Sequence, residues 1–165
     1  MECTYTTSGS SSKGVYASGI LAHHSGGVTL INCSVVDSTI MVTGASNNKC
    51  YIAGIFSTDS NSDYTLSNCL SDATLIVNGL TVGQRHQMAT VSPNGEAILI
   101  NCVYNNDKVV ACNATVNETN CFSGTTEEIK TNANNAIIDI LNTDLEKPIW
   151  YMDLEGRANL YPITK

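Results

Sequence analysis

One pentapeptide decides the fold, Tyr51-Ile52-Ala53-Gly54-Ile55, because it repeats Tyr16-Ala17-Ser18-Gly19-Ile20 at an offset of 35 residues. A weaker third copy, His86-Gln87-Met88-Ala89-Thr90, follows at the same offset. Self-similarity at a fixed period is the signature of a repeat architecture, in which each unit buries its apolar face against the next. The three copies therefore predict a stack of similar units.

Apolar positions downstream keep this period. They form three columns: Ile20 with Ile55; Ile40, Leu75 and Val110; and Val42, Val77 and Cys112. The repeats contain short β-rich runs separated by turn residues and show no helical periodicity. We therefore expect an all-β fold over residues 1–122, a right-handed parallel β-helix of about three coils of roughly 35 residues each. An antiparallel sandwich is the alternative, but it does not explain the period.

The chain begins partway through the repeat pattern, so we expect the array to be truncated at its N-terminal end. After residue 122 the pattern changes. Thr125 and Glu128 have the spacing of a capping box, and the apolar residues that follow, from Ile129 to Leu141, are spaced for one face of an amphipathic helix. Two short strands are expected after Pro148. We interpret residues 123–165 as a C-terminal helix plus β-hairpin cap over the open end of the array.

Charge and composition exclude several classes of partner. The net charge is −7, with 8 Lys and Arg residues against 15 Asp and Glu residues. Nucleic-acid binding needs clustered cations, so we expect no nucleic-acid partner. No apolar run approaches the roughly 20 residues of a membrane-spanning helix, so we expect no membrane span. The first residues lack the basic and apolar regions of a signal peptide.

An Asn-Cys step recurs once in each repeat. It comprises Asn32-Cys33, Asn68-Cys69 and Asn101-Cys102. Asn tolerates the left-handed backbone conformation of a tight corner, and stacked side-chain amides can bond to one another. The cysteines are expected to be small, buried core residues, because no spacing typical of a zinc site occurs. Cys3, Cys50 and Cys121 are expected to lie off this column, and the sequence leaves any disulfide among them open.

Another predicted column is acidic and contains Asp37, Asp72 and Asp107. Stacked carboxylates repel one another, so each needs a compensating contact. Turn chemistry, with each Asp accepting a backbone N–H, is the preferred explanation, and a cation or a calcium-dependent polysaccharide groove is the alternative. The polar loop at residues 58–63 lacks the glycine and terminal glutamate of a calcium-binding loop.

The remaining candidates for chemistry are few. Of the three histidines, His86 is expected at the Tyr51 position, and the His23-His24 pair lies in a Ser/Gly loop away from any predicted acid. Trp150, Tyr151 and Tyr161 are aromatic enough for a sugar-stacking platform, but we expect them to cover the last coil. We therefore predict no catalytic residue, no metal ligand and no cofactor.

The repeats and the tail together resemble the GLUG-motif and related β-helical surface proteins of gut Bacteroidetes. The resemblance rests on residues 16–20 and 51–55 with their Asn-Cys steps, and on the tail segments 136–142, 150–151, 156 and 161–163. It implies an exported, adhesin-like protein without known catalytic residues. We therefore expect a non-catalytic bacterial surface or secreted protein that binds a glycan or a host surface protein. A β-helical polysaccharide lyase or glycoside hydrolase fragment is the alternative.

Overall fold

The structure, a computed structural model, describes residues 2–7, 14–44, 49–58, 60–91, 95–106, 115–131, 136–152 and 158–160. Its body consists of three successive groups of four strands, which we call layers. Layer 1 contains β2 (Val15–Ser18), β3 (Leu21–Ala22), β4 (Val28–Ile31) and β5 (Ser34–Gly44). Layer 2 contains β6 (Lys49–Ala53), β7 (Phe56–Ser57), β8 (Asp63–Ser67) and β9 (Leu70–Asn78). Layer 3 contains β10 (Thr81–His86), β11 (Ala89–Thr90), β12 (Glu96–Ile100) and β13 (Val103–Asn105).

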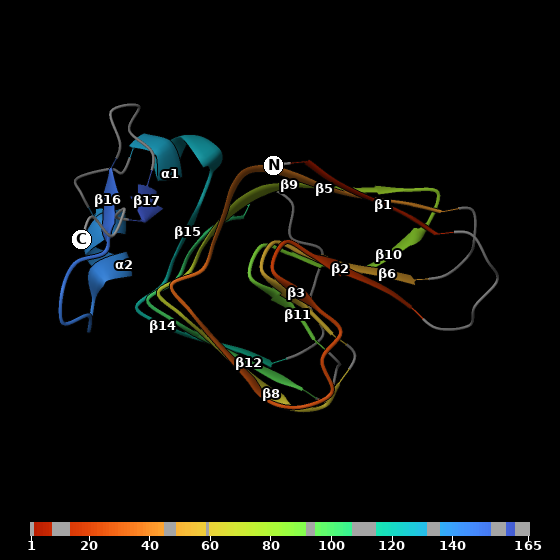
Figure 1. The fold of residues 1–165 in the computed structure, drawn as a ribbon, viewed down its shortest axis with the longest axis horizontal. Coiled ribbons are helices and arrows are strands. Elements are labelled where there is room, and N and C mark those ends of the chain that lie inside the picture. The colour runs from red at the N-terminus through yellow and green to blue at the C-terminus, as the bar shows by residue number, and fades with distance from the viewer. Residues whose placement is uncertain are drawn as a thin grey trace, which may run out of the picture.

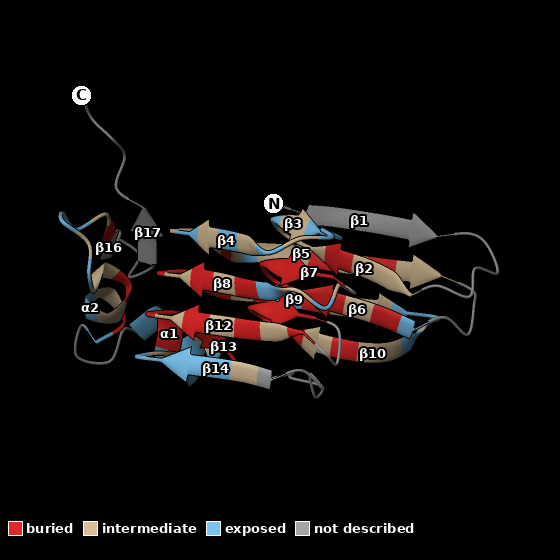
Figure 2. Ribbon diagram, turned by 90° about the horizontal axis from the view of Figure 1, so that it is seen from below, coloured by how far each residue is buried: buried red, intermediate tan, exposed pale blue. Residues whose placement is uncertain are grey.

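Each strand pairs in parallel with its counterpart in the next layer, which produces four sheets along the stack. Sheet A contains β5, β9 and β13, with β1 (Glu2–Thr7) and β15 (Phe122–Gly124) at its two edges. Sheets B and C contain β2, β6, β10 and β3, β7, β11. Sheet D contains β4, β8, β12 and β14 (Thr115–Thr119). Figure 1 shows the layers nearly superimposed, and Figure 2 shows the strands of successive layers side by side. The expected all-β, parallel arrangement is confirmed, and the antiparallel sandwich is wrong.

The 35-residue register holds between layers 1 and 2 but changes in layer 3. Tyr16 pairs with Tyr51 as expected. The register then shifts between Val82 and Gln84, so that Gln84 lies opposite Tyr51 and His86 lies opposite Ala53. A β-bulge at this point absorbs the difference. The unbroken period predicts His86 at the Tyr51 position, but the structure places Gln84 there instead.

Burial follows the stacking. Layer 2, which has a layer on either side, contains fully buried side chains such as Ile52 and Phe56. Ile40 pairs with Leu75 and Val42 pairs with Val77, as the predicted columns require, whereas Val110 and Cys112 lie outside the described residues. Ile20 is 46% exposed, although Ile55 in the same column is buried. The reason is that sheets B and C begin at β2 and β3 among the described strands, so no strand there covers Ile20.

The C-terminal segment packs against the side of the stack. It contains α1 (Thr126–Thr131), α2 (Ala136–Asn142) and an antiparallel hairpin of β16 (Trp150–Met152) and β17 (Ala158–Leu160). The capping box is present, because the Glu128 backbone N–H donates to Thr125 Oγ1 and the Thr125 backbone N–H donates to Glu128 Oε2. An apolar cluster joins both helices and the hairpin to sheet A through these residues: Ile129, Ile137, Leu141, Trp150, Leu70 and Val103.

This position differs from the predicted terminal cap. Figures 1 and 2 place α1 and α2 beside the layers, at the corner where sheets A and D meet. Among the described strands, β10 and β11 form the last edges of sheets B and C. Ile129, Ile137 and Leu141 of the predicted apolar helix face are buried, whereas Ala136 is exposed. The buried residues pack against Leu70 and Val103 of sheet A rather than over the end of the array.

Candidate binding surface

The asparagines of the Asn-Cys steps lie at the corner between sheets D and A. Asn32, Asn68 and Asn101 have left-handed backbones, with φ angles of 56°, 53° and 52°. Asn120, between β14 and β15, has a φ angle of 51° and occupies the same corner. Its short side chain suits this conformation because it avoids the crowding that larger residues meet there. Asn120-Cys121 is a further Asn-Cys step, which the three predicted repeats did not include.

The side-chain amides at this corner hold the end of α2. The Asn68 amide Nδ2 donates to the backbone carbonyls of Leu141 and Thr143, at 2.9 Å in each case. Asn101 Nδ2 donates to the Thr143 carbonyl at 3.3 Å. The Asn120 side-chain amide Nδ2 donates a hydrogen bond to the Asn101 amide oxygen Oδ1 at 2.8 Å. Because the last carbonyls of a helix have no partners within it, these bonds satisfy groups that would otherwise be costly to bury.

Replacing Asn68 by glycine is expected to lower the free energy of unfolding by about 2 kcal/mol, because two hydrogen bonds to α2 are lost while the left-handed backbone is retained. Trp150 is the chain's only tryptophan and packs in the apolar cluster that joins α2 to sheet A, which we call the α2 cluster. Its fluorescence therefore reports on this contact. We expect the Trp150 transition in urea to precede the loss of β-sheet circular dichroism. Asn32→Gly, at the same corner but without a bond to α2, is the matched control, and equal effects of both variants would contradict the prediction.

Cys33, Cys69, Cys102 and Cys121 form a single column beside the asparagines, because the strands that follow them are in register. Each thiol donates to the carbonyl two residues before it: Cys33 to Ile31 at 3.6 Å, Cys69 to Ser67 at 3.2 Å, Cys102 to Ile100 at 3.3 Å and Cys121 to Thr119 at 3.4 Å. We call these four residues the thiol column. The sequence analysis had placed Cys121 off the column, and the structure places it at one end.

The thiols differ in their pKa values according to burial and to their neighbours. Burial raises the pKa of Cys33, and it raises that of Cys50, a buried residue of β6, to about 11. The hydrogen bond from the Cys102 thiol is the main cause that lowers the pKa of Cys121 to about 7. The same bond raises the pKa of Cys102, which acts as the donor. Cys3 and Cys112 have side chains outside the described part of the structure.

Asp37 and Asp72, the two predicted aspartates within the described residues, are not in register. Asp72 lies opposite Val36, and the register of β5 shifts between Val36 and Thr39, which leaves Asp37 in a bulge with a φ angle of 47°. Asp107 lies outside the described residues. Asp72 instead accepts hydrogen bonds from Asn105 Nδ2 and Thr126 Oγ1, both at 2.8 Å. Its role is to connect sheet A to α1, so no acidic column arises from Asp37 and Asp72.

Sheet D brings together two other carboxylates that the sequence analysis did not pair. Asp63 of β8 and Glu96 of β12 are in register on neighbouring strands. Glu96 accepts a hydrogen bond from Asn117 Nδ2 of β14. Within the described ranges, no group of three or more His, Cys, Asp or Glu side chains is placed to hold a metal ion.

Two tyrosines stack on the outer side of sheet B. Tyr16 and Tyr51 occupy the same position in neighbouring layers, and their ring centroids lie 4.9 Å apart with an interplanar angle of 6°. Their inward neighbours Ala17 and Ile52 are buried, whereas both tyrosines are partly exposed. His23, after the bend that leads through β3, lies 5.9 Å from the Tyr16 ring. The repeat period, the alternation of side chains along the strands and the bend at β3 thus bring three aromatic rings together on one side of the molecule.

Gly83 supports the far side of this stack. A Cβ atom at Gly83 would lie 3.1 Å from Tyr51 Cε1, so the ring rests closely against the backbone of β10. Gly14 is similar, since a Cβ atom there would lie 3.0 Å from the Tyr16 hydroxyl. We call Tyr16, Tyr51 and His23 the aromatic corner. The sequence analysis used the tyrosines only as repeat markers, although the pairing of two aromatic residues at one repeat position was a usable signal.

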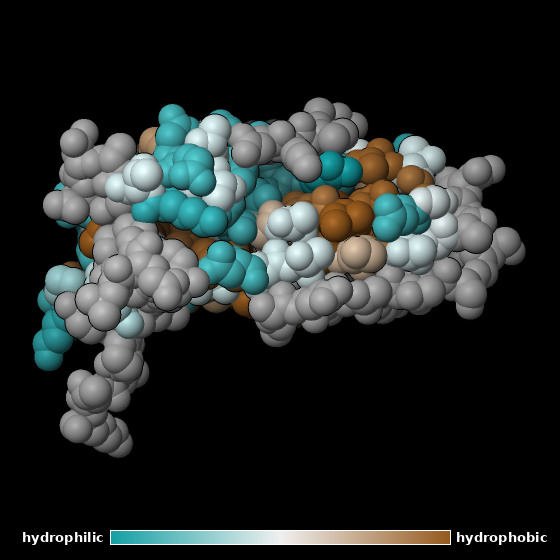
Figure 3. Space-filling view, turned by 90° about the horizontal axis from the view of Figure 1, so that it is seen from above, coloured by the Kyte–Doolittle hydropathy of each residue, from teal (hydrophilic) through white to brown (hydrophobic). Residues whose placement is uncertain are grey.

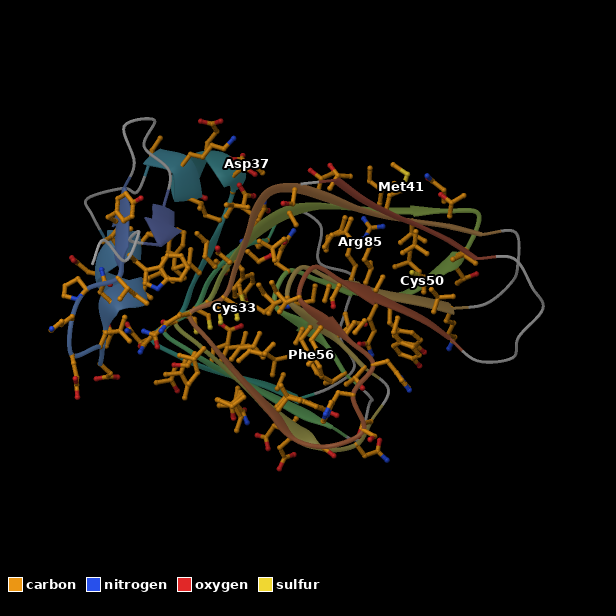
Figure 4. The ribbon with its side chains drawn as sticks, viewed as in Figure 1. Cys33, Asp37, Met41, Cys50, Phe56 and Arg85 are labelled. Carbon is orange, nitrogen blue, oxygen red and sulfur yellow. The ribbon has the colours of Figure 1, made fainter. Side chains whose placement is uncertain are left out.

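The other candidates differ in their exposure, and Tyr151 is partly exposed. Trp150 is only 1% exposed and packs in the α2 cluster, and Tyr161 lies outside the described residues. Figure 4 shows Arg85 and Cys50 between sheets A and B, inside the outline of the layers.

Figure 3 looks onto the outer side of sheet A, where apolar residues gather. Met41 and Ile76 are in register and partly exposed there.

No protein-family model matches the chain, and no match was found among the curated proteins or among the solved structures. Within the described residues, neither helix has the length and apolar character that crossing a membrane requires. The aromatic corner is therefore assessed on its own chemistry.

Proposed function

We propose that this chain is a non-catalytic repeat protein that displays a glycan-binding surface, as part of a bacterial surface or secreted adhesin-like protein. Its parallel sheets would belong to a right-handed parallel β-helix. The parallel pairing of equivalent strands across three layers supports this fold. The Asn-Cys corners and the paired tyrosines are among the features by which the sequence resembles the GLUG-motif proteins.

The observation that carries the proposed function is the stacked pair of Tyr16 and Tyr51 beside His23. The C–H bonds on one side of a sugar ring carry partial positive charge and favour the electron-rich face of an aromatic ring, while the Tyr hydroxyl supplies a hydrogen bond. Rigid side chains in a repeating backbone lose little conformational entropy on binding. A glycan is therefore the ligand that this corner fits best.

Substituting the tyrosines tests this proposal. Tyr16→Ala is expected to lower retention on a responsive polysaccharide or mucin column about five- to tenfold, because one ring contact of about 1 kcal/mol is lost. Tyr51→Ala is expected to lower retention as well, because it removes the ring that supports Tyr16. Tyr16→Phe keeps the ring and should retain most binding. Thr74→Ala, an exposed residue of sheet A, is the surface control.

Melting temperatures of all variants separate loss of binding from loss of fold. Retention that survives both alanine substitutions in folded protein would refute a role for the aromatic corner. Retention by a host protein but by no glycan would replace the ligand class while keeping the display function. Release of new reducing ends or unsaturated products would refute the non-catalytic assignment.

A polysaccharide lyase or glycoside hydrolase is the second candidate, and one observation favours it. Asp63 and Glu96 are neighbouring carboxylates on adjacent strands, and paired carboxylates are the usual machinery of glycoside hydrolysis. If this candidate is correct, product release should occur with wild-type protein and be abolished in Glu96→Gln. Absence of products from every polysaccharide that the protein retains would exclude it.

A further inference from the structure

The thiol column places four cysteines from separate parts of the chain at one position of successive strands. Its two ends differ in their neighbours. Cys33 is the layer 1 member, and Cys121 lies in the short connection between β14 and β15. Cys69 and Cys102 between them are fully buried, whereas Cys33 and Cys121 are partly exposed. Reagents in solvent therefore reach the column at its ends.

The geometry at the Cys121 end suits a covalent bond. Phe122 N donates to the Cys102 carbonyl at 2.9 Å, and Cys102 N donates to Cys121 Sγ at 3.4 Å. The two residues are thus direct neighbours on adjacent parallel strands. The usual strand spacing of about 4.8 Å lies within the Cα separations of about 4.4–6.8 Å that disulfides span. A bond between these residues requires only side-chain rotation and small backbone adjustment.

We propose that Cys121 is a thiol-modification site that reacts with small disulfides and then forms a disulfide with Cys102. This inference is independent of the proposed glycan binding, since the thiol column and the aromatic corner share no residue. The bond would join the β14–β15 connection covalently to layer 3, to which strand pairing and side-chain hydrogen bonds otherwise hold it.

The reaction has two steps. The Cys121 thiolate attacks one sulfur of a small disulfide, forms a mixed disulfide and expels one small thiolate. Cys102 then attacks Cys121 Sγ, which breaks the mixed disulfide and expels the second small thiolate, and the Cys102 proton leaves with that thiolate. The two cysteines together lose two electrons and two protons, and the small disulfide is reduced to two thiols.

Two observations favour Cys121 over the other thiols as the first to react. Cys102 lies next to it as a hydrogen-bond donor, which stabilises the thiolate and lowers the pKa of Cys121 to about 7. At the opposite end, burial raises the pKa of Cys33, so less of it is ionised at neutral pH. Cys50 is fully buried and its pKa is raised to about 11, so it should react last.

The test treats the folded chain with 5,5′-dithiobis(2-nitrobenzoate), a small disulfide whose released thiolate is coloured. The fastest phase should release two thiolates per chain, and peptide mapping after rapid alkylation should find Cys102 linked to Cys121. Cys121→Ser should abolish this phase. Cys102→Ser should release one thiolate and leave a stable adduct on Cys121. Cys33→Ser, the control at the other end, should leave the fast phase unchanged.

The peptide map of the wild-type protein decides the question even if a variant fails to fold. A first adduct on Cys33 or Cys50 would overturn the proposal, as would a persistent adduct on Cys121 with no link to Cys102. Reaction that appears only in denaturant would also overturn it. Circular dichroism recorded on the treated protein establishes that the fold is intact during the fast phase.

Discussion

Gly54→Ala is expected to lower the free energy of unfolding by about 3 kcal/mol, the upper end of the cost of overpacking a core. Gly54 lies between β6 and β7, where neighbouring groups pack closely against it. A Cβ atom there would collide with Ser71 Oγ and with the backbone carbonyl of Gln87. That carbonyl cannot retreat freely, because it accepts the Ile55 N–H at 3.1 Å. Equilibrium unfolding in urea, followed by circular dichroism, measures the effect.

Gly26→Ala is the matched control for this prediction. A Cβ atom at Gly26 would lie 3.4 Å from His24 Cε1, which is ordinary van der Waals contact. Its effect should therefore stay within about 0.5 kcal/mol, as for most surface substitutions. If both alanine variants unfold at the same urea concentration, the absence of a side chain at Gly54 is not required for stability, and the prediction fails.

Acid is expected to destabilise the fold through His86. This side chain is 6% exposed, and its Nδ1 atom accepts the backbone N–H groups of Met88 and Ala89 at 3.0 and 3.3 Å. Protonation of Nδ1 would abolish both bonds in a buried site, and burial lowers the pKa of His86 to about 4 from 6.5. Its ring neighbour Tyr104, at 5.1 Å, has a pKa raised by burial and stays neutral in this range.

The sign follows from proton binding. Between pH 6.5 and about 4 the unfolded chain binds a proton at His86 that the folded chain does not, so stability is fully present above pH 6.5 and falls as the pH falls through this window. The loss should approach about 3 kcal/mol at the acid end. Urea unfolding measured across this pH range gives the slope directly.

His86→Asn separates titration from packing. Asn Oδ1 can accept the same two backbone N–H groups but does not titrate, so the slope of stability against pH should become shallower even though packing against Tyr104 is reduced. His24→Asn, which changes an exposed histidine, should leave the slope as in the wild type. An unchanged slope in His86→Asn would show that other groups govern acid stability.

Local patterns in the sequence were sufficient for much of the architecture. The repeat of residues 16–20 at 51–55 predicted the pairing of Tyr16 with Tyr51, and the Asn-Cys steps predicted left-handed corners. The Thr125–Glu128 spacing predicted the start of α1. Each of these features depends on residues a few positions apart or on strict repetition, so the chemistry that produces it is visible along the chain.

Bulges explain where that reading departs from the structure. One bulge at Gly83 moves His86 away from Tyr51, and another at Asp37 removes this residue from the Asp72 register. The spacing from Cys102 to Cys121 is shorter than the period of 35 residues, so the period did not place Cys121 in the column. A bulge changes the register by one residue without a visible change in the local sequence pattern. The space that it needs is provided by strands of other layers, which are distant in the sequence.

The amino-acid sequence alone therefore specifies repeated parallel strands, asparagine corners and an amphipathic C-terminal segment, because strand alternation, the left-handed preference of Asn and helix capping act over short distances along the chain. The tertiary structure decides that α2 packs beside sheet A, that Cys102 lies against Cys121 and that His23 approaches Tyr16. These contacts depend on which faces meet once the layers have stacked, and that meeting is set by packing and register between residues that are distant in the chain.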